Sequence, residues 1–169
     1  MQSIRSILVV IDPTPGESLA LKRAKLIAGV TQAHLHLLVC DRKHEHSALL
    51  SVLKSSLTGE GYSVTTEQAW NESLHETIID VQQAEGCGLV IKQHLPDAPL
   101  KKALLTPADW KLLRYCPTPV LLVKTATPWV GGVVMAAIDV GNMDGEHRAL
   151  HASIVDHGFD IASLAKAQL

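Results

Sequence analysis

Three side chains that could bind a small ligand follow two short apolar runs of the sequence. Asp12 comes directly after the run at residues 7–11, and Lys92 and His94 follow the run at residues 89–91. Such runs are typical of buried strands in a parallel sheet, whose carboxyl ends form the rim of a ligand-binding crevice. A lysine and a histidine at that rim could recognise an anionic ligand. Equally, the Lys92 stem could cover the rim while its ammonium group stays in water.

A short helix is expected between this rim and the last apolar run of the first 124 residues. Thr106 opens it, Pro107 suits its first position, and Asp109 stands where the acid of a capping box would lie. Pro117 and Pro119 then end it, because proline cannot continue a helix. The apolar stripe of this helix consists of Trp110, Leu113 and Tyr115.

Strand-like and helix-like segments alternate along residues 1–124. The strand-like segments are residues 7–11, 33–40, 62–70, 89–91 and 120–123. This alternation predicts a parallel, doubly wound sheet with helices on both faces and a crevice where the first strand meets the fourth. We expect Asp12, Pro13 and Cys40, which ends the second strand, to line that crevice.

The ends of the helices are marked by capping and helix-breaking residues. Ser18 is expected to begin the first helix and Gly29 to end it. Gly59 and Gly61 are expected to end the second helix, and Asn71 is expected to cap the third.

The sequence restarts after residue 124. Residues 125–131 (TATPWVG) are expected to form a linker, and residues 133–139 (VVMAAID) repeat the LVVID of residues 8–12. A turn and a helical stripe follow, so residues 132–169 are predicted to be the first strand and helix of a second, incomplete domain. Residues 1–124 would then form the complete one.

Length and composition exclude several classes of protein. The 169 residues suffice for a domain with its own core, and a hydrophobic content of 47% argues against disorder. A net charge of -2 gives no electrostatic basis for binding nucleic acid or an anionic membrane. The longest apolar run, residues 129–138, is too short to span a bilayer. Three cysteines without a CxxC pair, and no signal-peptide core, favour reduced thiols in the cytoplasm.

The 9 histidines do not form a recognisable metal motif. His34 and His36 have strand spacing and are expected to share one face, and His147 and His151 have an i, i+4 spacing that can bind zinc. No third ligand accompanies the latter pair, and HRALH lacks the glutamate of a metalloprotease motif. We therefore expect no metal site, and no catalytic residue is assigned, since GxSxG is also absent.

Four segments resemble the universal stress protein family, and together they resemble its tandem, E-type members. They are LVVIDP at residues 8–13, CGLVIK at residues 87–92, LLTPADWKLLRYCPTPVLLVK at residues 104–124, and the restart at residues 133–139. The resemblance implies a Rossmann-like, adenine nucleotide alpha hydrolase-like α/β domain with a parallel five-stranded sheet in the order 3-2-1-4-5. It also implies a cytoplasmic stress-response role and pairing of domains through their fifth strands, but no particular reaction.

The sequence departs from the ATP-binding members of that family. Those members carry a segment of the form GxxGx9G, followed by Ser or Thr, whose backbone amides can cradle phosphate oxygens. Here residues 92–109, KQHLPDAPLKKALLTPAD, contain no glycine. Asp12 matches the family's acidic residue near the nucleotide, and Thr106 roughly matches the Ser/Thr, at a helix start that could still meet an anion. The ordinary ATP site is therefore expected to be absent.

Two functions remain open on this basis. The preferred one is a noncatalytic, ligand-sensing or scaffolding stress-response domain with a degenerate ATP site and no required cofactor. The alternative is an ATP-binding or ATP-hydrolysing protein that uses the same crevice. A receiver domain is disfavoured, because the third strand ends Gln68-Ala69-Trp70 without a phosphorylatable aspartate.

The predicted fifth strand carries no charge before Lys124. In the order 3-2-1-4-5 this strand is an edge, and an unpaired apolar edge is an aggregation hazard that proteins normally cover. The cover is expected to come from another copy of the chain or from the restart segment at residues 133–137, and a symmetric homodimer through this edge is preferred. Its residues are Val120, Leu121, Leu122 and Val123.

Overall fold

A computed structural model describes residues 4–14, 16–94, 107–142 and 144–169 of the chain. The chain divides into two compact units, one within residues 2–126 and one over residues 127–169. The first unit contains the whole sheet. Whether the second unit begins another domain of the same kind stays a prediction.

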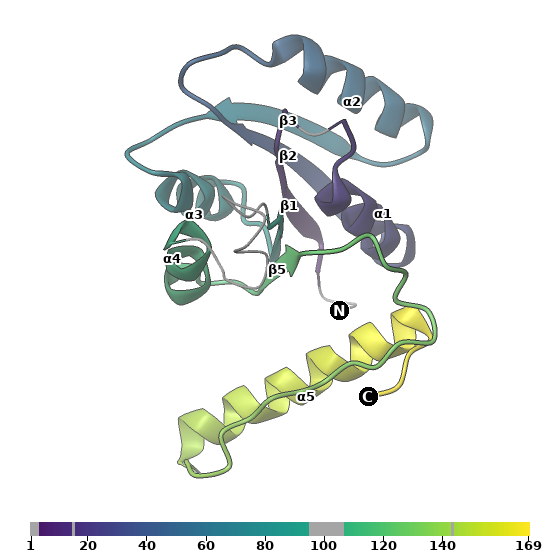
Figure 1. Ribbon diagram of the computed structural model, residues 1–169, viewed down its shortest axis with the longest axis vertical. Coiled ribbons are helices and arrows are strands. Elements are labelled where there is room, and N and C mark those ends of the chain that lie inside the picture. The colour runs from purple at the N-terminus through teal and green to yellow at the C-terminus, as the bar shows by residue number, and fades with distance from the viewer. Residues whose placement is uncertain (1–3, 15, 95–106, 143) are drawn as a thin grey trace. The chain divides into compact units, whose positions relative to one another are not determined.

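The first unit is built on one parallel sheet of five strands (Figure 1). Its order is β3-β2-β1-β4-β5, as predicted. Because Ile7 pairs with both Leu35 and Leu89, β1 is central and the carboxyl ends of β1, β2 and β4 lie together at one edge. The strands are β1 (Ser6–Ile11), β2 (His34–Cys40), β3 (Val64–Ala69), β4 (Leu89–Gln93) and β5 (Val120–Val123).

Helices cover both faces of this sheet, and so most residues of the inner strands are apolar. Figure 1 shows α3 (Leu74–Ala84) and α4 (Pro107–Tyr115) together on one side, with α1 (Leu19–Thr31) and α2 (Ser47–Gly59) on the other. A strand buried on both faces needs a continuous apolar run rather than alternation. On the α3/α4 side the core cluster includes Leu8, Val10, Leu38, Val90, Ile78, Val81 and Leu112.

The first helix begins as predicted but ends later. The Ser18 side chain accepts a hydrogen bond from the backbone N–H of Leu21. The helix continues past Gly29 to Thr31 and ends at Gln32, whose φ is 58° and whose backbone N–H donates to the Ala28 carbonyl at 2.8 Å. The Gln32 side chain also donates to the Gly29 carbonyl at 3.0 Å. These bonds satisfy the last carbonyls without a glycine in the left-handed region, so the prediction of Gly29 as the stop is wrong.

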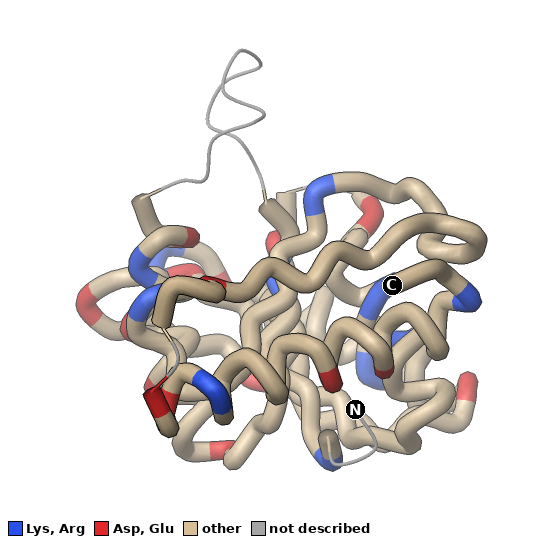
Figure 2. The backbone as a smooth tube through the Cα atoms, turned by 90° about the horizontal axis from the view of Figure 1, so that it is seen from below, with Lys and Arg blue, Asp and Glu red and all other residues tan. Residues whose placement is uncertain are grey.

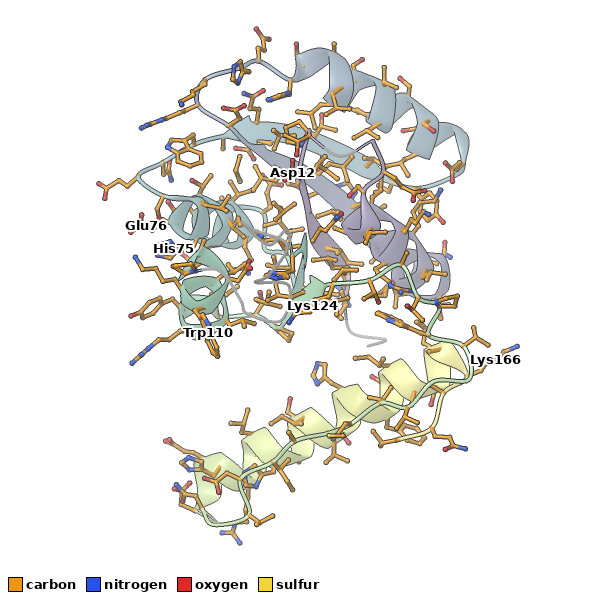
Figure 3. The ribbon with its side chains drawn as sticks, in the orientation of Figure 1. Asp12, His75, Glu76, Trp110, Lys124 and Lys166 are labelled. Carbon is orange, nitrogen blue, oxygen red and sulfur yellow. The ribbon has the colours of Figure 1, made fainter. Side chains whose placement is uncertain are left out.

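Ser73, rather than Asn71, caps α3. The Ser73 side chain accepts from the backbone N–H of Glu76, and its carbonyl accepts from the backbone N–H of Thr77 at 3.0 Å. Asn71 lies two residues earlier, where its own backbone N–H donates to the Thr77 hydroxyl at 2.9 Å. Figure 3 marks the first turn of α3 with His75 and Glu76.

The apolar stripe predicted for α4 is wrong. Trp110 is 62% exposed and Tyr115 is 59% exposed, whereas Asp109 and Leu112 are buried. Figure 3 shows Trp110 projecting from α4 away from the sheet. The helix is rotated in this way because Asp109 bonds to side chains of β4, and Leu112, three residues on, shares its face.

The second unit contains an extended segment and one long helix, but not the strand predicted at residues 133–139. Val133 makes a single isolated bridge with Gln168, and the Val134 N–H donates to the Gln168 carbonyl at 2.7 Å. A strand needs a partner along its length, and within the described part of this unit there is no second strand. The segment instead follows α5 (Gly145–Ala165), where a Cβ on Gly158 would lie 3.6 Å from the Ala136 Cβ (Figure 1). Among the described residues no helix is long and apolar enough to cross a membrane.

The cap of α3 gives a direct test of this local structure. We expect Ser73→Ala to lower the free energy of unfolding by about 1 kcal/mol, since it removes the acceptor for a helix-terminal N–H. Ser55→Ala, at an exposed position within α2, is the matched control and should change stability little. Chemical denaturation measures both, and equal effects of the two substitutions would show that Ser73 is not the cap.

Candidate functional site

A crevice of about 600 Å³ opens at the carboxyl ends of β1, β2 and β4. Its lining includes Asp12, Pro13, Cys40 and Lys92, four of the six residues predicted from the sequence. His94 is not in the lining, and Thr106 lies outside the described residues. The structure therefore brings most of the candidates together, while their role in binding stays a prediction. Further lining residues are Val10, Ile11, Thr14, Asp41, Leu74, Gln93, Pro107 and Ala108.

Asp12 closes the turn that follows β1. Its Oδ1 accepts hydrogen bonds from the Thr14 backbone N–H at 2.8 Å and from the Thr14 hydroxyl at 2.6 Å. This is an Asx turn, which explains an aspartate at this position without any ligand. Within the described residues both bonds use Oδ1, so Oδ2 remains available at the rim where Figure 3 labels Asp12.

Asp109 is the centre of a buried charge network between α4 and β4. Its side chain is fully buried, with Oδ1 2.9 Å from the Lys92 Nζ and Oδ2 2.8 Å from the His94 Nδ1. Lys92 also donates to the Gln93 carbonyl at 3.1 Å. Sequence reasoning assigned Asp109 only to a helix cap, because nothing in the local sequence indicates a partner fifteen residues away. Any contact between Asp109 and Thr106 falls outside the described residues.

This network changes the interpretation of Lys92 and His94. The Lys92 side chain is only 12% exposed and faces a carboxylate, so its positive charge is already compensated. His94 donates from Nδ1 to Asp109, and its buried Nε2 has no hydrogen-bond partner among the described residues. Neither side chain is free to neutralise an incoming polyanion.

The Cys40 side chain in the crevice lining is a protonated thiol and not a nucleophilic thiolate. Burial raises the pKa of this thiol to about 12, so it stays protonated at neutral pH. A protonated, half-buried thiol presents a small apolar surface. The lining cysteine therefore favours binding over covalent chemistry.

The loop after β2 is held in place at the other side of the crevice. Hydrogen bonds from the His46 side chain at 2.8 Å and the Lys43 backbone N–H at 2.7 Å hold the pKa of Asp41 well below its usual range. Gln68 of β3 ties the same loop down, donating to the His44 carbonyl at 2.7 Å. Hydrogen bonds within the protein therefore hold the loop on this side of the crevice in place.

Together these features define a class of protein: a doubly wound α/β domain with a crevice at the switch point between β1 and β4, as in proteins that bind small ligands there. Comparison with protein-family models matches residues 3–124 to the universal stress protein family. The chain belongs to this family, as the sequence resemblance indicated.

Individual relatives agree with this assignment. Universal stress protein E of Escherichia coli K12 is 29% identical over 96% of this chain and 58% of its own length. A putative universal stress protein from Pseudomonas aeruginosa UCBPP-PA14 is 68% identical, with a TM-score of 0.94 over 99% of this chain and 60% of that one. The chain therefore spans about three fifths of these relatives.

More distant structures share the fold. A universal stress protein in complex with cAMP is 15% identical, with a TM-score of 0.58 over 71% of this chain and 96% of that one. One from Archaeoglobus fulgidus in complex with dAMP is 12% identical, with a TM-score of 0.54 over 70% of this chain and 96% of that one.

The buried network predicts a specific stability pattern. Asp109→Asn leaves the Lys92 ammonium buried without a counter-charge, and we expect a loss of about 3–5 kcal/mol in the free energy of unfolding. The double variant Lys92→Met/Asp109→Asn removes both charges but keeps an amide oxygen for the His94 Nδ1–H, so it should recover much of that loss, and Lys92→Met alone completes the set. Asp156→Asn, at an exposed site on α5, is the control. Urea denaturation measures the two single variants, the double variant and the control, and a double variant as unstable as the sum of its single changes would contradict the network.

Proposed function

We propose that this protein is a ligand-binding stress-response protein that works without catalysing a reaction, and that its ligand occupies the crevice between Asp12 and Lys92. The observation that carries the proposal is the pairing of Lys92 and His94 with buried Asp109. This pairing lies at the end of β4, where the family resemblance implies the glycine-rich segment of ATP-binding members. A cytoplasmic location is part of the proposal and is supported by the free thiols of Cys40, Cys87 and Cys116.

A triphosphate is a poor match for this crevice. Of the charged side chains that line it, Asp12 and Asp41 are negative, and the single described cation, Lys92, is compensated by Asp109. Residues 92–109 contain no glycine, and their prolines lack the N–H that a phosphate would need. Each lost charge-assisted hydrogen bond is worth about 1.5–3 kcal/mol.

A ligand with less negative charge is the better match. Val10, Ile11, Pro13 and Leu74 supply apolar walls, and the free Oδ2 of Asp12 can accept a hydrogen bond from a hydroxyl or amine. Apolar walls with few polar groups are typical of small-molecule sites. The complexes of distant relatives with cAMP and dAMP support a nucleoside monophosphate as the first candidate.

The second candidate is an ATP-binding or ATP-hydrolysing protein that uses the same crevice. The observation in its favour is that Asp12 and the crevice lie where the family resemblance implies the nucleotide. Among the lining residues, however, Lys92 is paired with Asp109 and the Cys40 thiol is protonated, so they offer neither an uncompensated cation for the phosphates nor a thiolate.

Nucleotide titration distinguishes the two candidates. By isothermal calorimetry we expect ATP to bind more weakly than AMP or cAMP, since the described crevice lacks an uncompensated cation for the extra phosphates. Asp12→Asn keeps the turn acceptor but removes the charge, and Asp156→Asn, an exposed position on α5 outside the crevice lining, is the control. Micromolar ATP affinity that depends on Asp12, or ATP turnover, would establish the second candidate instead.

We also propose that the protein forms a homodimer through β5. Val120, Leu121 and Leu122 of this edge strand are only partly buried, whereas the opposite edge, β3, carries polar residues such as Thr65 and Gln68. An apolar edge requires a partner strand. Basic and acidic residues are interspersed along the described chain (Figure 2), which supports a protein partner rather than nucleic acid.

A charge on either edge strand tests this interface. In sedimentation equilibrium we expect Leu122→Lys to shift the protein towards monomer, because a buried ammonium would oppose pairing. Thr66→Lys on β3 is the matched control and should leave the mass unchanged. Thermal melting checks that both variants are folded. A wild-type monomer at tens of micromolar, or an unchanged Leu122→Lys dimer, would refute the proposal.

A further inference from the structure

Three side chains from separate elements converge on the α3/α4 side of the sheet, away from the crevice lining. They are His36 of β2, Glu67 of β3, and Glu85, which follows the last residue of α3. The Glu67 Oε2 lies 3.2 Å from the His36 Nε2, and the Glu85 Oε2 lies 3.6 Å from the His36 Nδ1. One ligand atom from each residue lies within 4.8 Å of the other two.

The cluster combines a buried base with carboxylates that solvent can reach. The His36 side chain is 5% exposed, whereas those of Glu67 and Glu85 are 40% and 45% exposed. His36 pairs with Leu8 on one side, in the core, and with Thr65 on the other, at the exposed edge. The imidazole is therefore fixed by packing, while the two carboxylates can adjust and water can enter.

Neither glutamate has another described partner of opposite charge. Within the described residues their ion pairs are those with His36. Asp41 and Asp144 also lie beside histidines, but each of these aspartates accepts a backbone N–H as part of a turn or a helix cap. Glu67 and Glu85 have no such structural bond among the described residues.

A chain of hydrogen bonds holds the His36 ring in place. Thr65 Oγ1 lies 2.8 Å from the His36 Nδ1 and 2.7 Å from the His34 Nε2, and the His34 Nδ1 lies 2.8 Å from the Ser63 hydroxyl. The chain can run in either direction. In one direction the His36 Nε2 donates to the Glu67 carboxylate at 3.2 Å and Nδ1 accepts from Thr65. In the other, His36 donates from Nδ1 to Thr65, so that the Nε2 lone pair faces the Glu67 carboxylate, and a metal ion can take the place of the Nε2 proton.

We propose that His36, Glu67 and Glu85 form a site for a divalent transition-metal ion, with zinc as the best match. The His36 Nε2 and one oxygen of each glutamate are the ligands, and water completes the coordination. Two ligands of a tetrahedral zinc lie about 3.3 Å apart, close to the separation of the His36 and Glu67 atoms. Mixed imidazole and carboxylate ligands favour zinc over magnesium or calcium. Thr65 is a positioning residue, because its hydroxyl lies 2.8 Å from the His36 Nδ1 and can accept the Nδ1 proton while Nε2 binds the metal.

Metal titration of the full, tag-free chain after chelator treatment tests the site. Zinc alone is the probe in calorimetry, and cobalt(II) is the probe for visible absorption, which reports coordination directly. We expect one ion per chain. Glu67→Gln and Glu85→Gln should each weaken binding at least tenfold and alter the cobalt spectrum, and Thr65→Val should weaken it about 10–100-fold.

The control is His147→Gln/His151→Gln on α5, which should leave affinity and spectrum unchanged. Glu85 is exposed beyond the end of a helix, so its substitution tests the site even if a change at Glu67 impairs folding. Absence of stoichiometric binding by the wild type would overturn the proposal. So would a Glu67→Gln/Glu85→Gln variant that binds zinc as tightly as the wild type.

Discussion

The buried contact of Asp109 with Lys92 and His94 is the interaction on which the candidate site depends. It joins the first turn of α4 to the end of β4, and with Leu112 it fixes which face of α4 meets the sheet. Removing two charges from water is costly unless geometry and hydrogen bonding compensate. The same contact therefore orients α4, leaves Trp110 at the surface, and neutralises the cation that would otherwise attract a phosphate.

The compensated charge of Lys92 and the absence of glycine from residues 92–109 both bear on which ligand the crevice could bind. In a phosphate cradle, backbone amides and an uncompensated cation act together on the ligand. Here the amides are limited by proline and the cation is bound internally, so two independent features disfavour a triphosphate. A crevice nevertheless persists, because its walls come from the strand ends rather than from the phosphate loop. A segment without glycine after β4 is thus compatible with a crevice at the strand ends, where the proposed ligand would bind.

The sequence predicted the sheet and much of the crevice, because both depend on local patterns. Alternating apolar runs indicated five strands, and strand ends placed Asp12, Cys40 and Lys92 at one rim. Contacts between distant segments could not be predicted in this way. The local sequence predicts only a cap role for Asp109, and nothing in it places Glu67 and Glu85 beside His36. The strand expected at residues 133–139 is wrong because periodicity cannot supply a partner strand.

The aspartates after the strands show how a shared motif can mislead. Asp12 accepts the backbone N–H of Thr14, Asp41 that of Lys43, and Asp139 that of Gly141, each two residues on. Asp139 follows a segment that is not a strand, yet it makes the same turn. The repeated Ile-Asp pair therefore reports a turn that an aspartate side chain closes, wherever the chain leaves an extended segment. Of the three, Asp12 and Asp41 line the crevice, so a ligand role for either follows from the position of its strand and not from the motif itself.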